Sequence, residues 1–561
     1  MSETKKDLKL ALEDWEQNER QPYIKKNPER RKVYKNDLGH AIKPLYTPLD
    51  LEERGFTYEK DLGFPGQLPQ TRGHNPNMLR SDFFRAGVYS GYGIAEVCRE
   101  RYEKIASWGA DEIDMAWDLP TQIGFDSDNI MSTGEVGRTG VAVDSLQDLE
   151  ILFADFDFRK LKNISLLANS MGPLGVAYLV NIGRKRGLEP KDFQAFMQND
   201  PLKEYAARGT YIYPVKPSVR LACDVIEWSI NNAPHWKTIK FCANHFNAAG
   251  AGSANASAFA MANGFVYIDE LISRGYTIEQ IVPHARIHVD EREDFFTMVA
   301  LGRATHKAWS IMMRKRYGAA EDSPALNIGL LGYSHGGETL QEPINNVLRI
   351  GFSALGYYLG GVTDISNAGY DEAMGLTTDR TSKVSLRTNQ IINNELGFGK
   401  VIDPLAGSYY VESLTMDMCN EILAQLEKIE KDYGNSIAAL DAGYLHGVIS
   451  KGAIRRQDEF ESKERVFTSL NIYPTDEELP RGAFKIDPTN EKHQIERLKK
   501  LRETRDNEKV RAALEKLDNV TRAGENVVEA TIEAVAAYAT HGEICDVWRN
   551  IFGEYRSMTT F

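Results

Sequence analysis

The chain has 561 residues, of which 42% are apolar and 26% charged, so its composition is that of an ordinary folded protein with roughly two to four domains. The formal net charge of -13 argues against nucleic acid or an anionic membrane as the main partner, because both bind basic surfaces. Five scattered cysteines without a CxxC pair support neither a disulfide framework nor a metal site, and without an apolar signal segment we expect a cytoplasmic protein.

The beginning of the chain is charged and lacks a compact apolar pattern. We interpret residues 1–45 as an N-terminal arm that contacts another subunit through one amphipathic helix. Its apolar positions are Leu8, Leu10, Ala11 and Trp15. The segment 63–80 is rich in Gly, Pro and Arg and therefore predicts a loop. Its basic residues, which either bind an anion or are solvated at the surface, are Arg72, His74 and Arg80.

Short apolar runs then alternate with segments of helical period. Eight runs are strand candidates, at 113–117, 164–168, 193–197, 239–243, 281–287, 326–331, 362–365 and 401–402. Eight strands separated by helices predict a (β/α)8 barrel, an α/β fold that we place at residues 46–410. Beyond it the pattern is helical, and we assign 411–561 to a C-terminal helical region that packs on the barrel and on a partner subunit.

Two of the predicted barrel helices carry end signals. The segment 143–153 predicts a helix with Asp144 as its N-cap, because Gln147 follows three positions later. The segment 171–187 predicts a second helix, which ends at Gly187 after a basic last turn.

Polar or ionisable residues follow nearly every strand candidate, where a barrel carries its active site. They are Asp118, Asn169, Gln198, Asn244, His245, His288, Tyr333, His335, Asn367 and Asp403. Helix N-caps explain about half of them, since Asp and Asn commonly open a helix. They do not explain Gln198 and His245, nor Arg208 farther along the chain.

The stretch 196–217 carries the chemistry best suited to a small acid. Lys203 and Arg208 follow a strand end, with the phenols of Tyr211 and Tyr213 close behind them. An arginine presents a planar fork of donors that matches a carboxylate, so the stretch predicts a site for a carboxylated ligand. The alternative is a polar strand end followed by a surface helix.

Nucleotide-binding and hydrolase motifs are weak. The chain has no P-loop, and GAGSAN, which begins at Gly250, lacks the third glycine of a dinucleotide fingerprint. The segment GYSHG (332–336) matches the short GxSxG pattern, which would make Ser334 a hydrolase nucleophile if a strained turn led into a helix there. A glycine-rich strand end is the alternative.

Eight ordered segments form longer motifs. They are TRGHNPNM (71–78), AWDLPTQIGFDSD (116–128), GEVGRTGVAVDS (134–145), QNDPLKEY (198–205), TYIYPVKPSVR (210–220), DEAMGLTTD (371–379), VIDPLAGSYYVE (401–412) and GEICDVWRNIFGEYR (542–556). Together they resemble the large subunit of the methylmalonyl-CoA mutase family, from about residue 15 to the C-terminus. The resemblance implies the same (β/α)8 barrel.

The resemblance also implies an adenosylcobalamin-dependent isomerase. In this family the acyl-CoA thioester lies along the barrel axis, the corrin covers the C-terminal face, and radical chemistry moves the thioester group to the adjacent carbon. The family's cobalamin-binding domain carries a DxHxxG motif, whereas no histidine of this chain has an aspartate two residues before it. We therefore expect a separate small cobalamin-binding subunit, in a heterodimer or heterotetramer with this chain.

The resemblance assigns roles to individual residues. Gln198 and His245 would hydrogen-bond the substrate carbonyl and carboxyl region, and Arg208 would pair with the free carboxylate of a methylmalonyl or succinyl group. Tyr89 matches the tyrosine that separates the adenosyl group from cobalt, and Glu372 matches a contact of the adenosyl ribose. Further expected substrate contacts are Met78, Arg80, Arg85, Ala116, Asn244, Arg286 and His288, and further cofactor contacts are Tyr333, His335 and Asn367. No metal ligands are expected.

Several positions depart from the family pattern. Asn244 stands where the family has a tyrosine, and Ala248 replaces a glutamate. Arg286 and His288 bring polar groups to a strand end that is apolar and aromatic in the family. The substrate is thus expected to be either a methylmalonyl- or succinyl-type acyl-CoA or a bulkier or hydroxylated branched acyl-CoA. A non-catalytic paralogue that only binds a partner subunit is the third hypothesis, and the joint presence of the site residues argues against it.

Overall fold

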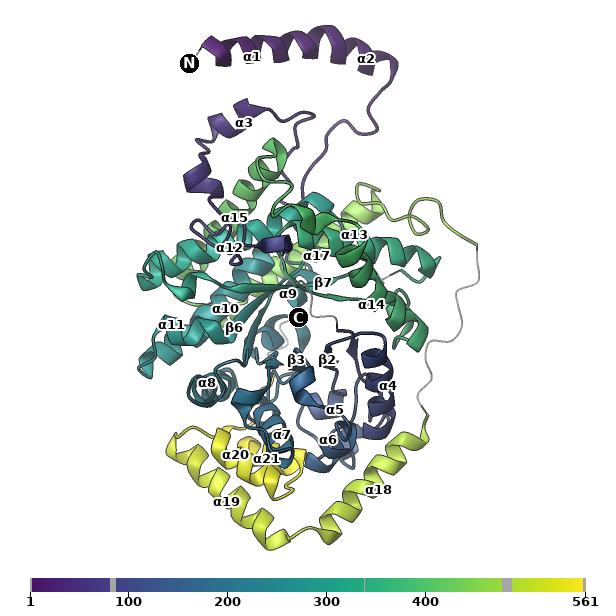
Figure 1. Ribbon diagram of the computed structural model, residues 1–561, viewed down its shortest axis with the longest axis vertical. Helices are drawn as coiled ribbons and strands as arrows, with labels where there is room; N and C mark the ends of the chain where they lie inside the picture. Colours follow the sequence, from purple (N-terminus) through teal and green to yellow (C-terminus); the bar gives the residue numbers. More distant parts are fainter. Residues whose placement is uncertain (1–2, 81–86, 337–338, 477–486, 558–561) are drawn as a thin grey trace.

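The computed structural model describes residues 3–80, 87–336, 339–476 and 487–557. Parallel strands lie at its centre, with the N-terminal arm at one end and the last helices at the other (Figure 1). The strands are β1 (Tyr89–Ser90), β2 (Glu112–Met115), β3 (Asn163–Leu166), β4 (Ala195–Met197), β5 (Ile239–Cys242), β6 (Ala285–Val289), β7 (Gly329–Ser334) and β8 (Asp364–Asn367). They form two sheets, in the orders β1-β2-β3-β4 and β5-β6-β7-β8.

Backbone hydrogen bonds join the two sheets on one side. The Met197 amide donates to the Lys237 carbonyl at 2.8 Å, and the Lys237 amide donates to the Ala195 carbonyl at 2.8 Å. The segment leading into β5 therefore pairs in parallel with β4. On the other side, no ladder within the described parts of the chain connects β8 with β1. The consecutive parallel strands and their covering helices confirm the predicted α/β class and (β/α)8 barrel.

Helices follow the strands along the chain, as the alternation predicts. The long ones are α4 (Ala95–Ser107), α7 (Gly172–Lys185), α8 (Val215–Asn232), α10 (Ser253–Ser273), α12 (Phe295–Tyr317), α13 (Asn346–Leu359) and α14 (Asp379–Asn394). Shorter ones are α5 (Leu119–Gln122), α6 (Leu146–Leu152), α9 (Asn244–Ala249) and α11 (Ile278–Ile281). Helix α7 ends just before Gly187, whose φ of 69° stops the helix where predicted.

One of the eight expected strand positions is wrong, and one strand of the barrel was not expected. Residues 401–402 form no strand, and Val401 is 56% exposed, because this pair follows a short 3-10 turn outside the barrel. The missed strand is β1, which pairs with β2 through Tyr89 and Ser90. Two residues without an apolar run carry no periodic signal, so the pairing with β2 alone defines this strand.

The N-cap of α6 is Ser145, and the prediction of Asp144 is wrong by one position. The Ser145 hydroxyl accepts from the Gln147 amide at 3.2 Å, and Asp148 accepts from the Ser145 amide at 3.0 Å. Asp144 has a tertiary role instead, since its carboxylate accepts from the Gln494 amide at 2.8 Å. That bond attaches a helix of the C-terminal region to the barrel.

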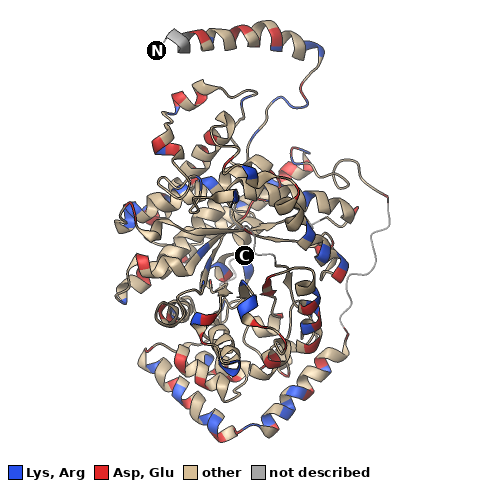
Figure 2. Ribbon diagram, in the orientation of Figure 1, with Lys and Arg blue, Asp and Glu red and all other residues tan. Residues whose placement is uncertain are grey.

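The C-terminal region is helical, as predicted. It contains α15 (Tyr409–Tyr433), α16 (Ser436–Asp441), α17 (Tyr444–Glu461), α18 (Thr489–Thr504), α19 (Asn507–Ala523), α20 (Val528–Ala536) and α21 (His541–Phe552). Helices α15 to α17 share an apolar core with β5 to β8, whereas α19 to α21 share a core with β2 to β4. Lys, Arg, Asp and Glu are interspersed along the outer helices α18 and α19 (Figure 2).

A buried ion-pair cluster joins α15 to the barrel. Arg303 of α12 is 0% exposed, and its guanidinium lies 2.9 Å from Asp403 and 2.5 Å from Glu412. Arg72, from the loop considered for anion binding, also pairs with Asp403, at 2.9 Å. Arg72 and Asp403 are therefore bonded within the protein and stabilise its fold.

The N-terminal arm begins with α1 (Glu3–Asp14), continues through a π-helical segment (Trp15–Arg20) into α2 (Gln21–Lys26), and reaches α3 (Pro48–Glu53). Its first helices project away from the body of the molecule (Figure 1). Leu10 is 55% exposed and Tyr23 is 64% exposed, so apolar side chains of the arm face outward. Across the described residues, no helix combines the length and apolar character needed to cross a membrane.

Candidate functional site

A cavity of about 270 Å³ lies at the C-terminal ends of the barrel strands. Each of the eight strands, or the residue directly after it, contributes to the wall. Nine of the predicted site residues line it: Tyr89, Gln198, Arg208, Asn244, His245, His288, Tyr333, His335 and Glu372. Parallel strands end at the same face of a barrel, so residues far apart in sequence meet here.

Lys203 lies outside the cavity lining and forms hydrogen bonds with two of the lining residues, Gln198 and His245. Its ammonium group lies 2.8 Å from Gln198 Oε1, 3.1 Å from His245 Nδ1 and 3.0 Å from Glu204 Oε1. The Asn169 side-chain amide also donates to Gln198 Oε1, at 3.1 Å. The charge of Lys203 is fully buried and is balanced by the adjacent carboxylate of Glu204.

Glu204 in turn positions Arg208. The Arg208 guanidinium donates to Glu204 Oε1 at 3.2 Å and to the Thr210 hydroxyl at 3.0 Å, and the Thr210 hydroxyl donates to Glu204 Oε2 at 2.6 Å. Burial raises the pKa of Glu204, but the charges of Lys203 and Arg208 outweigh burial and bring that pKa below its usual range. The carboxylate is therefore ionised and fixes the arginine at the cavity wall.

Two phenols and a carboxylate stand together on another side of the cavity. The Tyr333 hydroxyl donates to Glu372 Oε2 at 2.8 Å, and the Tyr333 ring lies 4.8 Å from the ring of His335. Burial raises the pKa of Tyr89, so its phenol is neutral. This side presents hydroxyl groups and a carboxylate, the groups that hydrogen-bond a sugar.

His288 and Asn244 add polar atoms without partners. His288 is 6% exposed, and both of its ring nitrogens lack a hydrogen-bond partner among the described residues, as does Asn244 Oδ1. Burial, followed by the charge of Lys240, lowers the pKa of His288 well below its usual range. The neutral imidazole therefore offers one donor and one acceptor to a ligand.

A charged group of three residues adjoins His288. His335 Nε2 lies 2.6 Å from Asp290 Oδ1, and Arg292 Nε lies 3.1 Å from Asp290 Oδ2. Burial raises the pKa of Asp290, but the opposing effect of the charges of His335 and Arg292 is larger, so the pKa lies below its usual range. The aspartate is thus ionised and holds the two residues beside the cavity.

The inner part of the cavity carries two charged residues, Lys240 and Asp114, that were not among the predicted site residues. Lys240 alternates with apolar residues in β5, points into the barrel, and stacks its ammonium group 4.8 Å from the Phe196 ring centre. Asp114 of β2 lines the same space, and burial raises its pKa although the charge of Lys240 opposes that effect. The period of two along β5 is the signal that would have identified Lys240.

Arg286, Met78 and Arg80, all predicted to contact the substrate, lie apart from this cavity. Arg286 precedes His288 by two positions on β6 and lies across Gly329, where any side chain would collide with its guanidinium. Met78 is buried at 2% exposure in the loop before β1, and Arg80 is exposed. Arg85 lies outside the described residues.

Ala116 and Asn367 line an adjoining cavity of about 100 Å³, together with Tyr89, Tyr333 and Glu372. The Asn367 amide donates to Asn389 Oδ1 at 2.8 Å, so bonds within the protein already fix this side chain. The two cavities share one wall, which contains the two tyrosines and the glutamate.

Ser334 does not have the geometry of a hydrolase nucleophile. It ends β7, the next α-helix begins only at Asn346, and its hydroxyl donates to Asn367 Oδ1 at 2.5 Å. A nucleophile elbow needs a sharp turn from strand into helix and a histidine as partner. The glycine-rich strand end is therefore the correct alternative.

The tyrosines near Arg208 belong to the core. Tyr211 stacks on Tyr205 with 5.4 Å between ring centres, and Tyr213 packs edge-on against Trp548 of α21 at 6.2 Å. The polar stretch thus divides into a cation-bearing part at the cavity and an aromatic part that binds the C-terminal helices.

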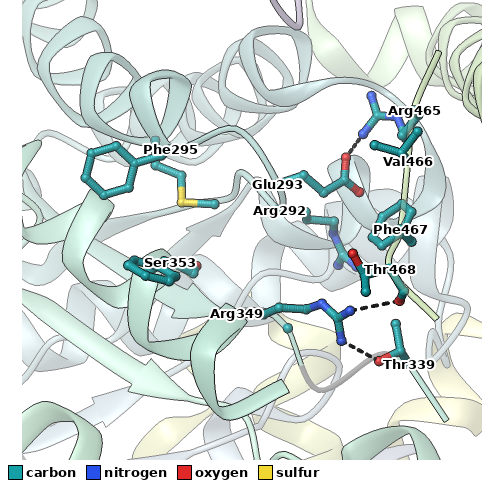
Figure 3. A pocket seen from close by; sticks show the side chains of 13 residues that line it. Arg292, Glu293, Phe295, Thr339, Arg349, Ser353, Arg465, Val466, Phe467 and Thr468 are labelled. Carbon is teal, nitrogen blue, oxygen red and sulfur yellow. Dashed lines mark hydrogen bonds and ion pairs between the residues drawn. The ribbon is translucent and has the colours of Figure 1, made fainter. Parts of the chain in front are cut away.

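A further cavity, of about 300 Å³, lies between α12, α13 and residues 465–468 (Figure 3). Arg292 lines both this cavity and the barrel cavity. Arg349 donates to the Thr339 hydroxyl at 2.8 Å and to the Thr468 carbonyl at 3.1 Å (Figure 3). These bonds fasten residues 465–468 to α13 beside the barrel mouth. Within the described ranges, no three His, Cys, Asp or Glu side chains are grouped so that they would hold a metal ion.

Comparisons with known proteins agree with this arrangement. A family profile described as methylmalonyl-CoA mutase matches residues 35–554. The 2-hydroxyisobutanoyl-CoA mutase large subunit of Aquincola tertiaricarbonis is 34% identical over 562 residues, which cover 99% of this chain and 99% of that protein. Methylmalonyl-CoA mutase of Escherichia coli is 34% identical over 525 residues, 93% of this chain and 72% of that protein. The human mitochondrial methylmalonyl-CoA mutase is 30% identical over 534 residues, 95% of this chain and 70% of that protein.

Proposed function

The chain belongs to the methylmalonyl-CoA mutase family, and from this premise we propose that it is the large, substrate-binding subunit of an adenosylcobalamin-dependent acyl-CoA mutase. Its reaction is an isomerisation, in which the thioester carbonyl group of a carboxylated acyl-CoA moves to the adjacent carbon. The observation that carries the proposal is the meeting of Arg208, Gln198 and His245 in one cavity at the barrel mouth.

Arg208 supplies recognition of the free carboxylate. Its Nη1 is held by Glu204 and Thr210, and the same side chain lines the cavity, so a guanidinium of fixed orientation faces the ligand. A carboxylate that pairs with it gains charge-assisted hydrogen bonds, which are stronger than those between neutral groups. A methylmalonyl or succinyl group provides such a carboxylate next to the thioester.

His245 and Gln198 bind the thioester oxygen. Burial, followed by the charges of Lys203 and Arg208, lowers the pKa of His245 well below its usual range, so the ring is neutral. Both side chains line the cavity and both have nitrogen donors for a carbonyl oxygen. Fixed donors stabilise the charge that develops on this oxygen as the group moves, and the enclosed cavity excludes water.

Residues at one side of the cavity fit the adenosyl part of the cofactor. Tyr89, Tyr333 and Glu372 line both the substrate cavity and the adjoining smaller one, and the bond from Tyr333 to Glu372 holds the carboxylate in place for a ribose. His335 and Asn367, with Ala116, surround the same region. When bound, adenosylcobalamin supplies the radical that starts the rearrangement.

The lower ligand of cobalt would come from another chain. The sequence contains no DxHxxG motif, and the relative from Aquincola is itself named a large subunit. We therefore assign cobalamin binding to a small partner subunit, in a heterodimer or heterotetramer. In this assembly residues 46–410 form the acyl-CoA-binding barrel, 1–45 the contact arm, and 411–561 the region that packs on the barrel and on the partner.

A bulkier or hydroxylated branched acyl-CoA is the second candidate substrate. His288 and Asn244 offer unpaired polar atoms at the cavity, and the small side chain of Ala248 lines it beside them. A hydroxyl group can accept from the protonated nitrogen of the neutral His288 ring or donate to the other nitrogen. Arg208 would still bind a carboxylate in such a substrate, so the two candidates share one recognition element.

A substrate screen tests the proposal. The chain, a small cobalamin-binding subunit and adenosylcobalamin are incubated with methylmalonyl-, succinyl-, butyryl- and hydroxylated branched acyl-CoA esters, and the isomeric CoA esters are separated and quantified. We expect carboxylated esters to be isomerised and butyryl-CoA to be left unchanged. Isomerisation of butyryl-CoA without any carboxylated ester would overturn the assignment of the substrate class.

A further inference from the structure

Lys203 is the most deeply enclosed cation near the cavity, and it acts there only through other residues. Its side chain is 0% exposed and lies behind the cavity wall that Gln198 and His245 form. An ammonium group has three hydrogens and no acceptor. All three hydrogens have acceptors, namely Gln198 Oε1, His245 Nδ1 and Glu204 Oε1, at 2.8, 3.1 and 3.0 Å.

This bonding determines where His245 carries its proton. Because Lys203 must donate, Nδ1 of His245 must accept, and the single proton of the neutral ring therefore resides on Nε2. The ring is neutral because burial, and after it the charges of Lys203, Arg208, His288 and Lys240, lower its pKa. The nitrogen that Lys203 does not engage is thus a donor.

The same cation orients the amide of Gln198. Gln198 Oε1 accepts from Lys203 at 2.8 Å and from the Asn169 amide at 3.1 Å. With its oxygen engaged twice on the protein side, the amide directs its NH₂ group to the other side, where Gln198 lines the cavity. Two donors therefore face the ligand as a consequence of one buried ammonium group.

We propose that Lys203 is a positioning residue of the mutase reaction, which sets His245 and Gln198 as paired donors to the thioester carbonyl oxygen. This inference rests on the proposed function. Without Lys203, acceptors remain beside Nδ1 while their donor is gone, so the neutral ring prefers its proton on Nδ1. An unprotonated Nε2 then faces the carbonyl oxygen, and two lone pairs repel each other.

Lys203→Met tests the proposal through the pH dependence of kcat/KM in the complex with the small subunit and adenosylcobalamin. We expect a loss of at least about tenfold at pH 8, in line with the loss of an oriented donor. Activity should partly recover as the pH falls, because a protonated imidazole carries hydrogens on both nitrogens. The wild type should show no such recovery, since its Nε2 is protonated throughout.

Two control variants separate positioning from folding. Lys307 of α12 is another buried lysine, is paired with Asp61 at 2.8 Å, and is not among the residues that line the cavity. Lys307→Met should lower the melting temperature without recovery of activity in acid. In the double variant Lys203→Met/His245→Gln, the acid recovery should disappear, because the titrating ring is gone.

Nitrogen-15 NMR of histidine-labelled chain gives a readout that needs no activity. The His245 signals, identified by their absence from His245→Gln, should report the Nε2-protonated tautomer in the wild type and a shift toward the Nδ1-protonated one in Lys203→Met. A wild-type ring protonated on Nδ1, or a variant that keeps both the wild-type tautomer and the wild-type pH profile, overturns the proposal. The expected tautomers without any mutase activity would leave the positioning geometry intact and refute the proposed function alone.

Discussion

Replacing Arg208 by glutamine should selectively weaken the binding of carboxylated ligands. The Arg208 side chain is 22% exposed, lines the cavity, and uses Nη1 for Glu204 and Thr210. A ligand carboxylate is therefore left to the other edge of the planar guanidinium. Glutamine keeps part of the volume but removes the charge, so it cannot replace that interaction.

The size of the effect follows from the charge and partial burial of the site. A hydrogen bond to a charged group contributes about 1.5–3 kcal/mol. At about 1.4 kcal/mol for each factor of ten, the affinity for a carboxylated acyl-CoA should fall about 10- to 150-fold. Glu204 retains Lys203 at 3.0 Å as its partner, so the rest of the site stays neutralised in the variant.

Inhibition constants provide the assay, because they do not require the ligand to be turned over. The inhibition constants of succinyl-CoA and butyryl-CoA are measured for wild type and Arg208→Gln, and the ratio of the two should change by the factor above. Arg292→Gln is the matched control, since Arg292 lines the same cavity but already pairs with Asp290 at 3.1 Å. Equal weakening of both ligands by Arg208→Gln would refute carboxylate recognition by this arginine.

Four further results are expected. Isothermal titration of the chain alone with adenosylcobalamin should detect no tight binding, and nanomolar affinity without a partner would contradict a separate cobalamin subunit. Arg303→Met should lower the free energy of unfolding in urea by about 3–5 kcal/mol, because it leaves the buried Glu412 carboxylate without its cation, and a loss under 1 kcal/mol would contradict this. Burial and two neighbouring aspartates raise the pKa of Glu291 from 4.5 to about 8. The contribution of its protonated carboxyl group to stability is therefore complete below pH 4.5 and is lost as the pH rises through 8. Glu291→Gln should remove that loss from unfolding curves recorded between pH 4 and 9, and an unchanged pH dependence would contradict the raised pKa. His288→Phe should reduce kcat/KM for a hydroxylated ester more than for methylmalonyl-CoA, whereas an equal reduction would assign His288 to a group that both substrates share.

The arrangement of the barrel could be read from local patterns. Apolar runs in β2 to β8 and helical periods between them predict parallel strands, and parallel strands place their C-terminal ends at one face. Gln198 and His245 follow two such strands, so the sequence alone indicates that they meet. The two-residue strand β1 has no pattern of its own, and only its pairing with β2 reveals it.

Which polar residues of a strand reach the cavity depended on packing. Arg286 and His288 are two positions apart on β6, so the strand period places both on the same face. The absence of a side chain at Gly329 lets Arg286 lie across the neighbouring strand, whereas His288 remains at the cavity. Whether a residue of β6 reaches the cavity thus depends on the size of the residue beside it on β7, and the sequence pattern of β6 carries no information about that size.

The sequence by itself predicted that an arginine suited to a carboxylate and two hydrogen-bond donors stand near the strand ends. Only the tertiary structure decided how these residues are held. Lys203 and Glu204 form an ordinary charged pair in sequence, of the kind usually found in solvent. Their complete burial behind Gln198, His245 and Arg208 follows from the packing of the segment after β4 against α9, which contains His245. Buried charges persist only where partners of opposite charge and hydrogen-bonding groups surround them.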